Sequence, residues 1–359
     1  MKKISLIATS ILIISLVLVG CRGNNGSGTN EEGTQRLKVG LVTAAGGIND
    51  GSFNEAANRG ILQAEEQLNI QRLNPIESNQ QEQYQPNLKT MASAADLTVG
   101  ISFMMRESME AISSQLPDKK FLLVDAVVDK ANVVSYMFKE QEGAFLAGAM
   151  AGVITKTNKI GFVGGVQSST IERFEAGFIA GVASVNPTAA KGLMPGSSSS
   201  HGQYVKYIND FSDQSKAKEA ATILYNSGVD IIFHCAGGAG EGVFSAAKEK
   251  NTFAIGVDSD QASTLPNYKD VILFSVVKKV DTAVFEGIKD TLDGNFRGGE
   301  TITLGIKEQG VAISETLSES VSQEAKDIEE KARNSVIQEN ITVPLSLSEL
   351  LRFNAPALR

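Results

Sequence analysis

The chain has 359 residues, of which 42% are hydrophobic and 21% are charged, a composition typical of a globular protein large enough for two cores. Its formal net charge of −8 gives a surface that repels nucleic acid, so nucleic acid is not expected as a partner. Two cysteines and two histidines are too few for a disulfide framework or a zinc site of usual composition, so neither a metal nor another cofactor is expected.

The first twenty residues have the pattern of an export signal. Lys2 and Lys3 precede an uncharged, largely apolar stretch that ends in Leu18-Val19-Gly20-Cys21. This ending resembles the lipobox of bacterial lipoproteins, in which the cysteine thiol receives a diacylglyceryl group before cleavage. We therefore expect a signal peptide at residues 1–20. An ordinary export signal or a plain membrane anchor is the alternative.

The expected lipid on Cys21, with acyl chains such as palmitate, anchors the chain to the cell membrane so that it faces the periplasm or the exterior. Residues 21–36 are polar and glycine-rich, which is typical of a flexible tether. The folded part is therefore expected to begin at residue 37.

Beyond the tether, short apolar runs alternate with segments of helical length. Strands are predicted at residues 38–42, 97–101, 121–124, 159–163, 230–233 and 253–257, and helices at 54–68, 108–116 and 171–184. Such alternation predicts βαβ units, and hence an α/β fold whose parallel sheets are covered by helices.

Two stretches of the chain correspond to each other. Lys38-Val39-Gly40-Leu41-Val42 leads to Phe53, and Lys159-Ile160-Gly161-Phe162-Val163 leads to Phe174, each ring fifteen residues after its lysine. Ligands of open α/β sheets bind at the carboxyl ends of the strands. Two facing sheets would therefore place Phe53 and Phe174 on opposite walls of one cleft, as a clamp for a flat ligand. Both rings could instead be core residues, and Phe233 competes with Phe174 as the second ring.

Carboxylates and a lysine follow three of the apolar runs. Asp125 and Asp258 come directly after predicted strands, and Lys278 follows the run 271–277. A carboxylate accepts two hydrogen bonds, which suits vicinal hydroxyls such as those of ribose, and a lysine can donate to the same hydroxyls. The alternative for the two carboxylates is a solvent-exposed cap or an ion pair across the lobes, and the alternative for Lys278 is a surface position.

Two glycine-containing loops are further candidates. Residues 44–54 bring Asn49, Asp50 and Asn54 together before a helix, although a turn and an N-cap would explain the same residues. Residues 236–243 lack the Lys-Ser/Thr of a P-loop and the third glycine of the dinucleotide fingerprint. This second loop, with Gly237, is expected to contact an uncharged ligand through its backbone.

No enzyme is expected. The most tempting cluster, Ser197 to Ser200 with His201, lies in a loop rich in glycine and serine and has no nucleophile-elbow motif.

Six motifs in order resemble the basic membrane protein family, the nucleoside-binding lipoproteins of spirochaetes and other bacteria. They are Lys38-Val-Gly-Leu-Val-Thr, Gly46-Gly-Ile-Asn-Asp-Gly-Ser-Phe-Asn54, Ile171-Glu-Arg-Phe-Glu-Ala-Gly-Phe178, Gly237-Gly-Ala-Gly-Glu-Gly-Val-Phe244, Gly256-Val-Asp-Ser-Asp-Gln261 and Val277-Lys-Lys-Val-Asp281. The resemblance covers nearly the whole chain after the tether. It implies the type I periplasmic-binding-protein fold, and delivery of a purine nucleoside such as inosine, guanosine or adenosine to an ABC permease.

For the site, the resemblance implies which candidate residues contact the base and which contact the ribose. Phe53 stacks on the base, with Asn49, Asp50 and Asn54 nearby. The ribose is held by Asp125, Asp258 and Lys278, and Gly237 packs against the ligand. Ala44 stands where many members carry an acidic residue, so the preferred nucleoside stays open.

The expected domain organisation is two lobes joined by a hinge. Lobe 1 is expected at residues 37–140 with part of the chain after about 263, and lobe 2 at 141–262 with the segment from about 311 to 359. The hinge crossings are then expected near Gln141, Ser263 and Val311.

Three other functions stay open at this stage. A sugar or autoinducer receptor of the same fold would use the same rings and carboxylates. A nucleoside hydrolase would need a cluster of aspartates near the N-terminus, which Asp50 alone does not supply. An adhesin that binds a host protein is the third.

Overall fold

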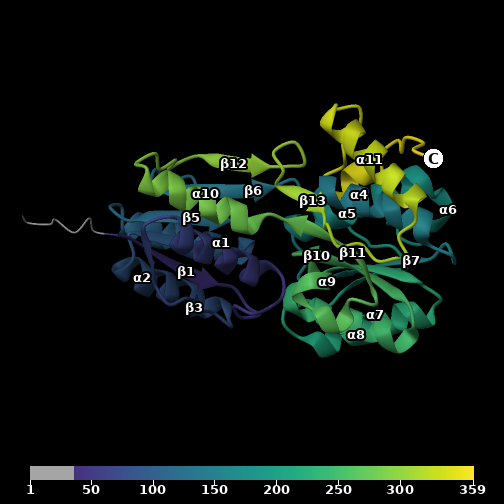
Figure 1. Cartoon of the computed structure of the whole chain (residues 1–359), viewed down its shortest axis with the longest axis horizontal. Coiled ribbons are helices and arrows are strands. Elements are labelled where there is room, and N and C mark those ends of the chain that lie inside the picture. The colour runs from purple at the N-terminus through teal and green to yellow at the C-terminus, as the bar shows by residue number, and fades with distance from the viewer. Residues whose placement is uncertain (1–35) are drawn as a thin grey trace, which may run out of the picture. The chain divides into compact units, whose positions relative to one another are not determined.

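The computed structural model describes residues 36–359 (Figure 1). The predicted signal peptide, the predicted lipidation site at Cys21 and almost all of the predicted tether lie outside the described residues. Within the described part of the chain, none of the helices is both long enough and apolar enough to cross a membrane.

The first sheet has seven strands, all parallel, in the order β12-β6-β5-β4-β1-β2, with β3 also paired to β1. The strands are β1 Leu37–Thr43, β2 Ile70–Arg72, β3 Ile76–Glu77, β4 Leu97–Ile101, β5 Lys120–Val124, β6 Val133–Phe138 and β12 Thr301–Leu304. Its helices are α1 Phe53–Gln67, α2 Tyr84–Ala94, α3 Arg106–Gln115 and α10 Val280–Leu292, with 3-10 turns η1 Gln81–Gln83 and η2 Phe103–Met105. We call this sheet and its helices the first lobe.

The second sheet has six strands in the order β13-β11-β10-β9-β7-β8, parallel except for β13. The strands are β7 Ile160–Gly164, β8 Val205–Tyr207, β9 Ile231–Cys235, β10 Phe253–Asp258, β11 Ile272–Lys278 and β13 Val311–Ile313. Its helices are α4 Glu140–Ile154, α5 Ser169–Val185, α6 Pro187–Ala190, α7 Gln214–Asn226, α8 Glu241–Lys250, α9 Gln261–Thr264, α11 Gln323–Ile337 and α12 Leu347–Leu350, with turns η3 Gly237–Gly240 and η4 Pro266–Tyr268. This is the second lobe.

The α/β class and its two helix-covered parallel sheets agree with the sequence-based expectation. The six predicted strands correspond to β1, β4, β5, β7, β9 and β10, and the three predicted helices to α1, α3 and α5. Their central strands are almost entirely buried, because helices cover both faces of each sheet.

The chain passes between the lobes three times. It crosses from β6 to α4 at Lys139, returns from β11 to α10 at Lys279, and crosses again between β12 and β13. The second crossing differs from the expectation near Ser263. The reason is that the apolar strand Ile272–Lys278 pairs in parallel with β10 and extends the second sheet before the chain leaves it.

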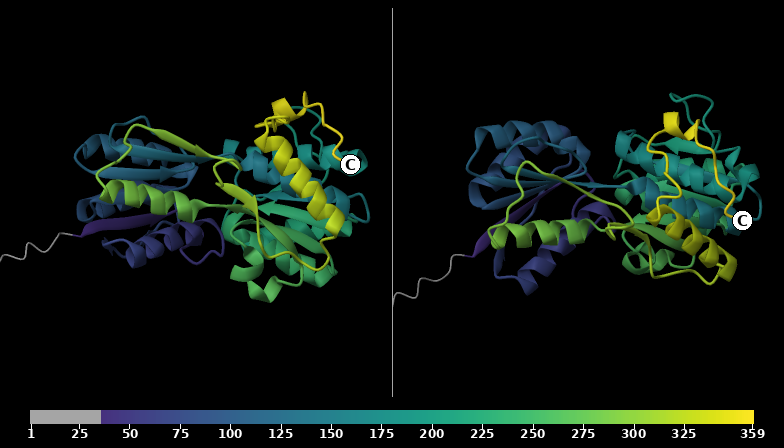
Figure 2. Two further views of the ribbon diagram at one scale, coloured as in Figure 1. Left: turned by 45° about the horizontal axis from the view of Figure 1, so that its top comes forward. Right: turned by 90° about the horizontal axis from the view of Figure 1, so that it is seen from above.

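Close helix contacts fix the segments that carry the crossings. In the first lobe α10 lies alongside α1 (Figure 2). The two helices are so close that a Cβ on Gly60 would clash with the Asp281 carbonyl oxygen. In the second lobe a Cβ on Gly177 would clash with the Gln141 carbonyl oxygen, so the first turn of α4 packs directly against α5. Glu140 is thereby held against the residues of α5.

Candidate functional site

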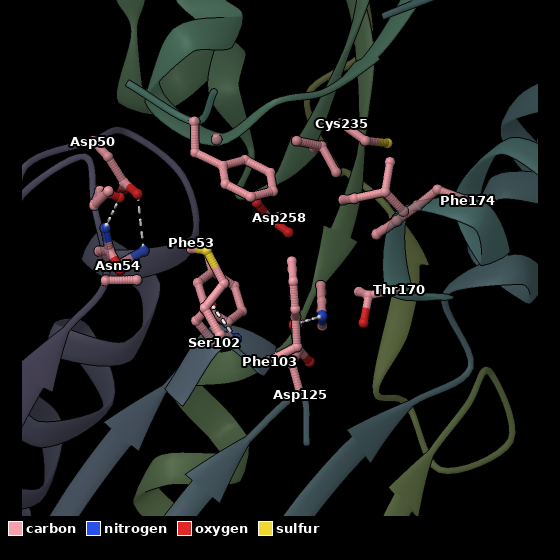
Figure 3. A pocket seen from close by; sticks show the side chains of 18 residues that line it. Asp50, Phe53, Asn54, Ser102, Phe103, Asp125, Thr170, Phe174, Cys235 and Asp258 are labelled. Atoms are coloured by element: carbon pink, nitrogen blue, oxygen red, sulfur yellow. Dashed lines mark hydrogen bonds and ion pairs between the residues drawn. The ribbon is translucent and has the colours of Figure 1, made fainter. Parts of the chain in front are cut away.

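A cavity lies where the carboxyl ends of strands from the two lobes face each other (Figure 3). It contains about 570 Å³ of empty space, part of which is open to solvent. The lining residues are Ala44, Ala45, Asp50, Phe53, Asn54, Ser102, Phe103, Met104, Asp125, Thr170, Ile171, Phe174, Phe211, Cys235, Gly237, Val257, Asp258 and Lys278.

Eight of the ten predicted ligand-binding residues line this cavity: Asp50, Phe53, Asn54, Asp125, Phe174, Gly237, Asp258 and Lys278. The other two lie elsewhere. Asn49 is exposed in the turn before α1. Phe233 is fully buried, because β9 points it into the core, where its ring lies 5.0 Å from Phe178 and 6.1 Å from Phe174.

Asp50 stabilises the turn that precedes α1 through hydrogen bonds to its side chain. Its carboxylate accepts hydrogen bonds from the backbone N–H groups of Ser52, Asn54 and Glu55 at 2.9, 3.0 and 3.0 Å. Burial raises the pKa of Asp50 although these bonds oppose the rise. The carboxylate thus satisfies donors at the start of the helix and fixes the position of Phe53.

Asn54 presents an acceptor in the cavity. Its Nδ2 donates to the carbonyl oxygens of Ala45 and Gly47 at 3.2 and 3.0 Å, which fixes the orientation of the amide because carbonyls only accept. Within the described part of the chain, the buried Oδ1 of Asn54 has no hydrogen-bond partner. It is available to accept a hydrogen bond from a ligand.

Four charged groups form a buried chain from the cavity into the hinge. Lys278 Nζ lies 2.6 Å from Asp125 Oδ2 and 2.9 Å from Glu140 Oε1, and Arg173 Nε lies 2.6 Å from Glu140 Oε2. Lys278 is 1% exposed and Glu140 is completely buried. Because each of these charges has a neighbour of opposite sign, the four side chains can be accommodated in the interior, where an unpaired ion would be very costly.

The pKa values follow from burial and pairing. Burial alone would lower the pKa of Lys278, but Asp125, Glu140 and Asp258 outweigh it and the pKa is raised. Burial alone would raise the pKa of Glu140, yet Lys278 and Arg173 hold it below its usual value. For Asp125 and Asp258 burial prevails, and each pKa rises to about 6.

Residues with a positive φ angle stand at the carboxyl ends of three strands beside the cavity. Ser102, Asp125 and Asp258 have φ values of 111°, 71° and 64°. Such a conformation costs on the order of 1–3 kcal/mol outside glycine, and strain of this kind clusters at functional sites. Asp125 directly follows β5 and Asp258 ends β10, so the two carboxylates enter the cavity from different lobes.

The aromatic residues surround the same space. Phe53 is half-buried, and its ring centroid lies 5.1 Å from Lys278 Nζ. Phe103 of the first lobe meets Phe211 of the second edge to face, with centroids 6.3 Å apart. Phe174 is only 2% exposed, because α5 begins five residues before it whereas α1 begins at Phe53 itself. The two rings of the internal correspondence therefore share a cavity without being equally accessible.

Sequence reasoning missed several of these residues. Phe211 is an aromatic residue isolated between polar ones in Asn209-Asp210-Phe211-Ser212-Asp213, and this contrast is a signal that could have revealed it. Glu140 and Arg173 gave no such signal, since charged residues at the starts of helices are usually exposed.

Two α/β lobes that enclose a cavity lined by rings, carboxylates and a buried lysine define a two-lobed solute-binding protein. Residues 37–346 match the family model Bmp, described as ABC transporter substrate-binding protein PnrA-like, and the chain belongs to this family. It is thus a substrate-binding protein of an ABC transporter, not an enzyme. The resemblance to the basic membrane protein family and the expected fold are confirmed.

Individual relatives agree with the family match. The chain is 36% identical to the CD4+ T-cell-stimulating antigen of Listeria innocua and to the ABC transporter nucleoside-binding protein BmpA of Lactococcus lactis, each over 96% of this chain and 99% of the relative. A solved ABC transporter solute-binding protein from Aeropyrum pernix superimposes with a TM-score of 0.75 at 26% identity, covering 86% of this chain and 94% of that one.

Proposed function

We propose that this protein captures a purine nucleoside in the cavity between its lobes and delivers it to an ABC permease. The observation that carries the proposal is that the half-buried Phe53 ring and the Asp125 carboxylate both lie next to Lys278. Lys278, which bonds to Asp125, lies 5.1 Å from the Phe53 ring centroid. A nucleoside has the same layout, with a flat base joined to a sugar that carries vicinal hydroxyls.

Stacking and one amide suit the base. Phe53 offers a ring face, with Phe211 and Phe174 as the candidate second ring, and stacking contributes about 1–3 kcal/mol per base. The unpartnered Oδ1 of Asn54 suits an N–H on the edge of a purine.

Free carboxylate oxygens suit the ribose. Asp125 bonds to Lys278 through Oδ2, and within the described residues its buried Oδ1 has no partner. Asp258 accepts from the Ser52 hydroxyl through Oδ2, which leaves its other oxygen for a ligand hydroxyl. An acceptor that is buried and unpaired is costly unless a ligand supplies the missing donor.

The charge of the site favours an uncharged nucleoside over a nucleotide. Asp50, Asp125, Asp258 and Glu140 supply four carboxylates in or next to the cavity. Lys278 and Arg173 are already paired with two of them. A phosphate would therefore meet net negative charge in a low-dielectric setting.

A thermal-shift screen of the purified protein against nucleosides, free bases, nucleotides and sugars tests the proposal. A ligand at a hundred times its Kd adds about 2.7 kcal/mol of stability, which is visible as a higher Tm. We expect inosine, guanosine or adenosine to raise the Tm more than the corresponding nucleoside monophosphates. A shift with sugars and none with nucleosides would overturn the proposal.

We also propose that Cys21 carries the lipid that anchors the chain to the membrane. The support is the lipobox-like Leu18-Val19-Gly20-Cys21 after the apolar stretch. Replacement Cys21→Ala should abolish incorporation of labelled palmitate and release the chain from the membrane fraction. Unchanged labelling of the variant would rule this anchor out.

A further inference from the structure

Several hydrogen bonds cross between the lobes at one place beside the cavity. On the first lobe the acceptors are backbone carbonyls of the turn Gly51–Ser52, directly before α1. Thr264 Oγ1 donates to the Gly51 carbonyl at 3.1 Å, Gln261 Nε2 donates to the same oxygen at 3.3 Å, and Ser259 Oγ donates to the Ser52 carbonyl at 3.2 Å. All three donors belong to the segment that follows β10 in the second lobe.

The neighbouring side chains add two more crossings. Ser52 Oγ donates to Asp258 Oδ2 at 2.6 Å, and Arg59 Nη2 donates to Ser259 Oγ at 3.0 Å. The turn also packs tightly, because a Cβ on Gly51 would lie 3.0 Å from the Leu265 side chain and the residue has a φ of +61°. A side chain at position 51 would push the two lobes apart at this point.

The amide of Gln261 is oriented before it reaches the other lobe. Its Oε1 accepts from the backbone N–H of Val257 and lies 2.9 Å from His234 Nε2. Burial lowers the pKa of His234 to about 4, so at neutral pH the ring carries one proton, which the bond to Oε1 places on Nε2. The Nε2 of Gln261 is therefore turned toward the Gly51 carbonyl.

The polar groups of the cavity are almost completely buried while these contacts between the lobes are in place. Asp125 is 6% exposed, Asp258 is 7% exposed and Lys278 is 1% exposed. Movement of the lobes away from each other would expose these groups further, and it would break the bonds at Gly51 and Ser52. These bonds join protein groups alone, so their formation does not depend on which solute is inside.

We propose that Ser259, Gln261 and Thr264 are positioning residues that latch the closed lobes through the backbone carbonyls of Gly51 and Ser52, and that this latch sets the dissociation rate of the bound solute. The inference rests on the proposed function, because it takes the bound solute to be a nucleoside. Contacts that exist only in the closed form slow dissociation and leave the association rate nearly unchanged.

The structure offers variants that weaken the latch while the carbonyls of Gly51 and Ser52 each keep a hydrogen-bond donor. Thr264→Val is nearly isosteric, and the Gly51 carbonyl keeps its bond from Gln261. Ser259→Ala leaves the Ser52 carbonyl paired with the Ala56 backbone N–H at 3.0 Å. The matched control is Ser263→Ala, since the Ser263 hydroxyl bonds to Asp260 and Thr316 within its own lobe.

The first measurement is the dissociation rate of inosine from the full chain by stopped-flow displacement. Each single variant should dissociate inosine about two- to tenfold faster than the wild type, the double variant faster still, and the association rate should change little. Ser263→Ala should match the wild type. Equal dissociation rates in the double variant and the control would overturn the latch, as would a rise in rate that merely follows a lower Tm of the unliganded protein.

The second measurement needs no nucleoside and separates failure of the latch from failure of the proposed function. Small-angle X-ray scattering of the unliganded full chain should give a larger radius of gyration for the double variant than for the wild type and Ser263→Ala. If inosine does not bind at all, the nucleoside proposal fails, and scattering alone decides on the latch. Identical scattering from all three proteins would overturn it.

Discussion

Lys278 Nζ lies 2.6 Å from Asp125 Oδ2, although the two residues are 153 positions apart in the chain. Lys278 ends β11 in the second lobe, and Asp125 follows β5 in the first. The ion pair therefore spans the lobes at the floor of the cavity, and Glu140 at the first hinge crossing binds the same ammonium. Asp125, which we propose contacts the ribose, is thus connected through Lys278 to Glu140 at the hinge.

Replacement Lys278→Met should destabilise the protein strongly. It leaves the buried carboxylates of Asp125 and Glu140 without their shared cation, and breaking a buried pair typically costs about 3–5 kcal/mol. Urea unfolding at pH 7.5 measures the loss. The control is Lys279→Met, because within the described part of the chain Lys279 makes no ion pair. A similar free energy of unfolding for the two variants would show that the buried pairs contribute little.

Replacement Phe53→Ala should weaken inosine binding by about 1–3 kcal/mol, because it removes a stacking surface from the base. Isothermal titration calorimetry measures the affinity. Phe121→Leu serves as the comparison, since Phe121 is fully buried in the core of the first lobe and does not line the cavity. It should lower the Tm and keep the affinity close to that of the wild type. Full affinity in Phe53→Ala would remove the stacking role.

Replacement Asp258→Asn should stabilise the unliganded protein at neutral pH while weakening nucleoside binding. Burial raises the folded-state pKa of Asp258 to about 6, above its ordinary value of 3.8, so the ionised form is disfavoured in the folded protein. Between these pH values the folded state binds more protons than the unfolded state, so the destabilisation caused by the buried Asp258 carboxylate decreases as the pH is lowered. The increase in the free energy of unfolding that Asp258→Asn brings is therefore full above pH 6 and disappears toward pH 4.

Urea unfolding of both proteins at pH 7.5 and pH 5 tests this dependence. We expect a gain on the order of 1–3 kcal/mol at pH 7.5 and a smaller one at pH 5. The exposed Asp270→Asn provides the reference for loss of a surface charge. A variant that is less stable than the wild type at pH 7.5 would contradict the assignment of a burial cost to Asp258.

The two histidines should titrate on opposite sides of their ordinary pKa of 6.5. His201 Nδ1 lies 3.0 Å from the fully buried carboxylate of Glu175, and this hydrogen bond raises the pKa of His201. His234 is buried beside Gln261, and burial lowers its pKa to about 4. The stability that His201 contributes is fully present below pH 6.5 and is lost as the pH rises through its folded-state pKa.

Proton NMR of the imidazole signals checks this prediction, since the chain contains only two histidines. One signal should titrate above pH 6.5, and the other should stay at its neutral-form position down to pH 5. The variant His201→Gln should remove the signal of the higher pKa and so assign it. Two signals that both titrate near pH 6.5 would contradict the burial of His234 and the pairing of His201.

The sequence by itself determined the α/β class, the positions of the main strands and eight of the eighteen residues that line the cavity. Apolar periodicity is a short-range property, and Asp125, Asp258 and Lys278 each stand directly after an apolar run, so their place at strand ends could be predicted one segment at a time. The sequence also supplied the family motifs from Lys38 to Asp281, which the family match confirms.

Only the tertiary structure decided which of these groups meet. The pairing of Glu140 with Lys278 and Arg173, the bonds from Ser259 and Thr264 to the turn before α1, and the placement of Phe211 all depend on how distant segments pack. The face to which β9 turns Phe233 depends on the layer that covers it, and the length of β11 depends on its pairing with β10. Contacts across the lobes depend on how the two sheets are placed relative to each other. A local pattern of residues does not encode this placement.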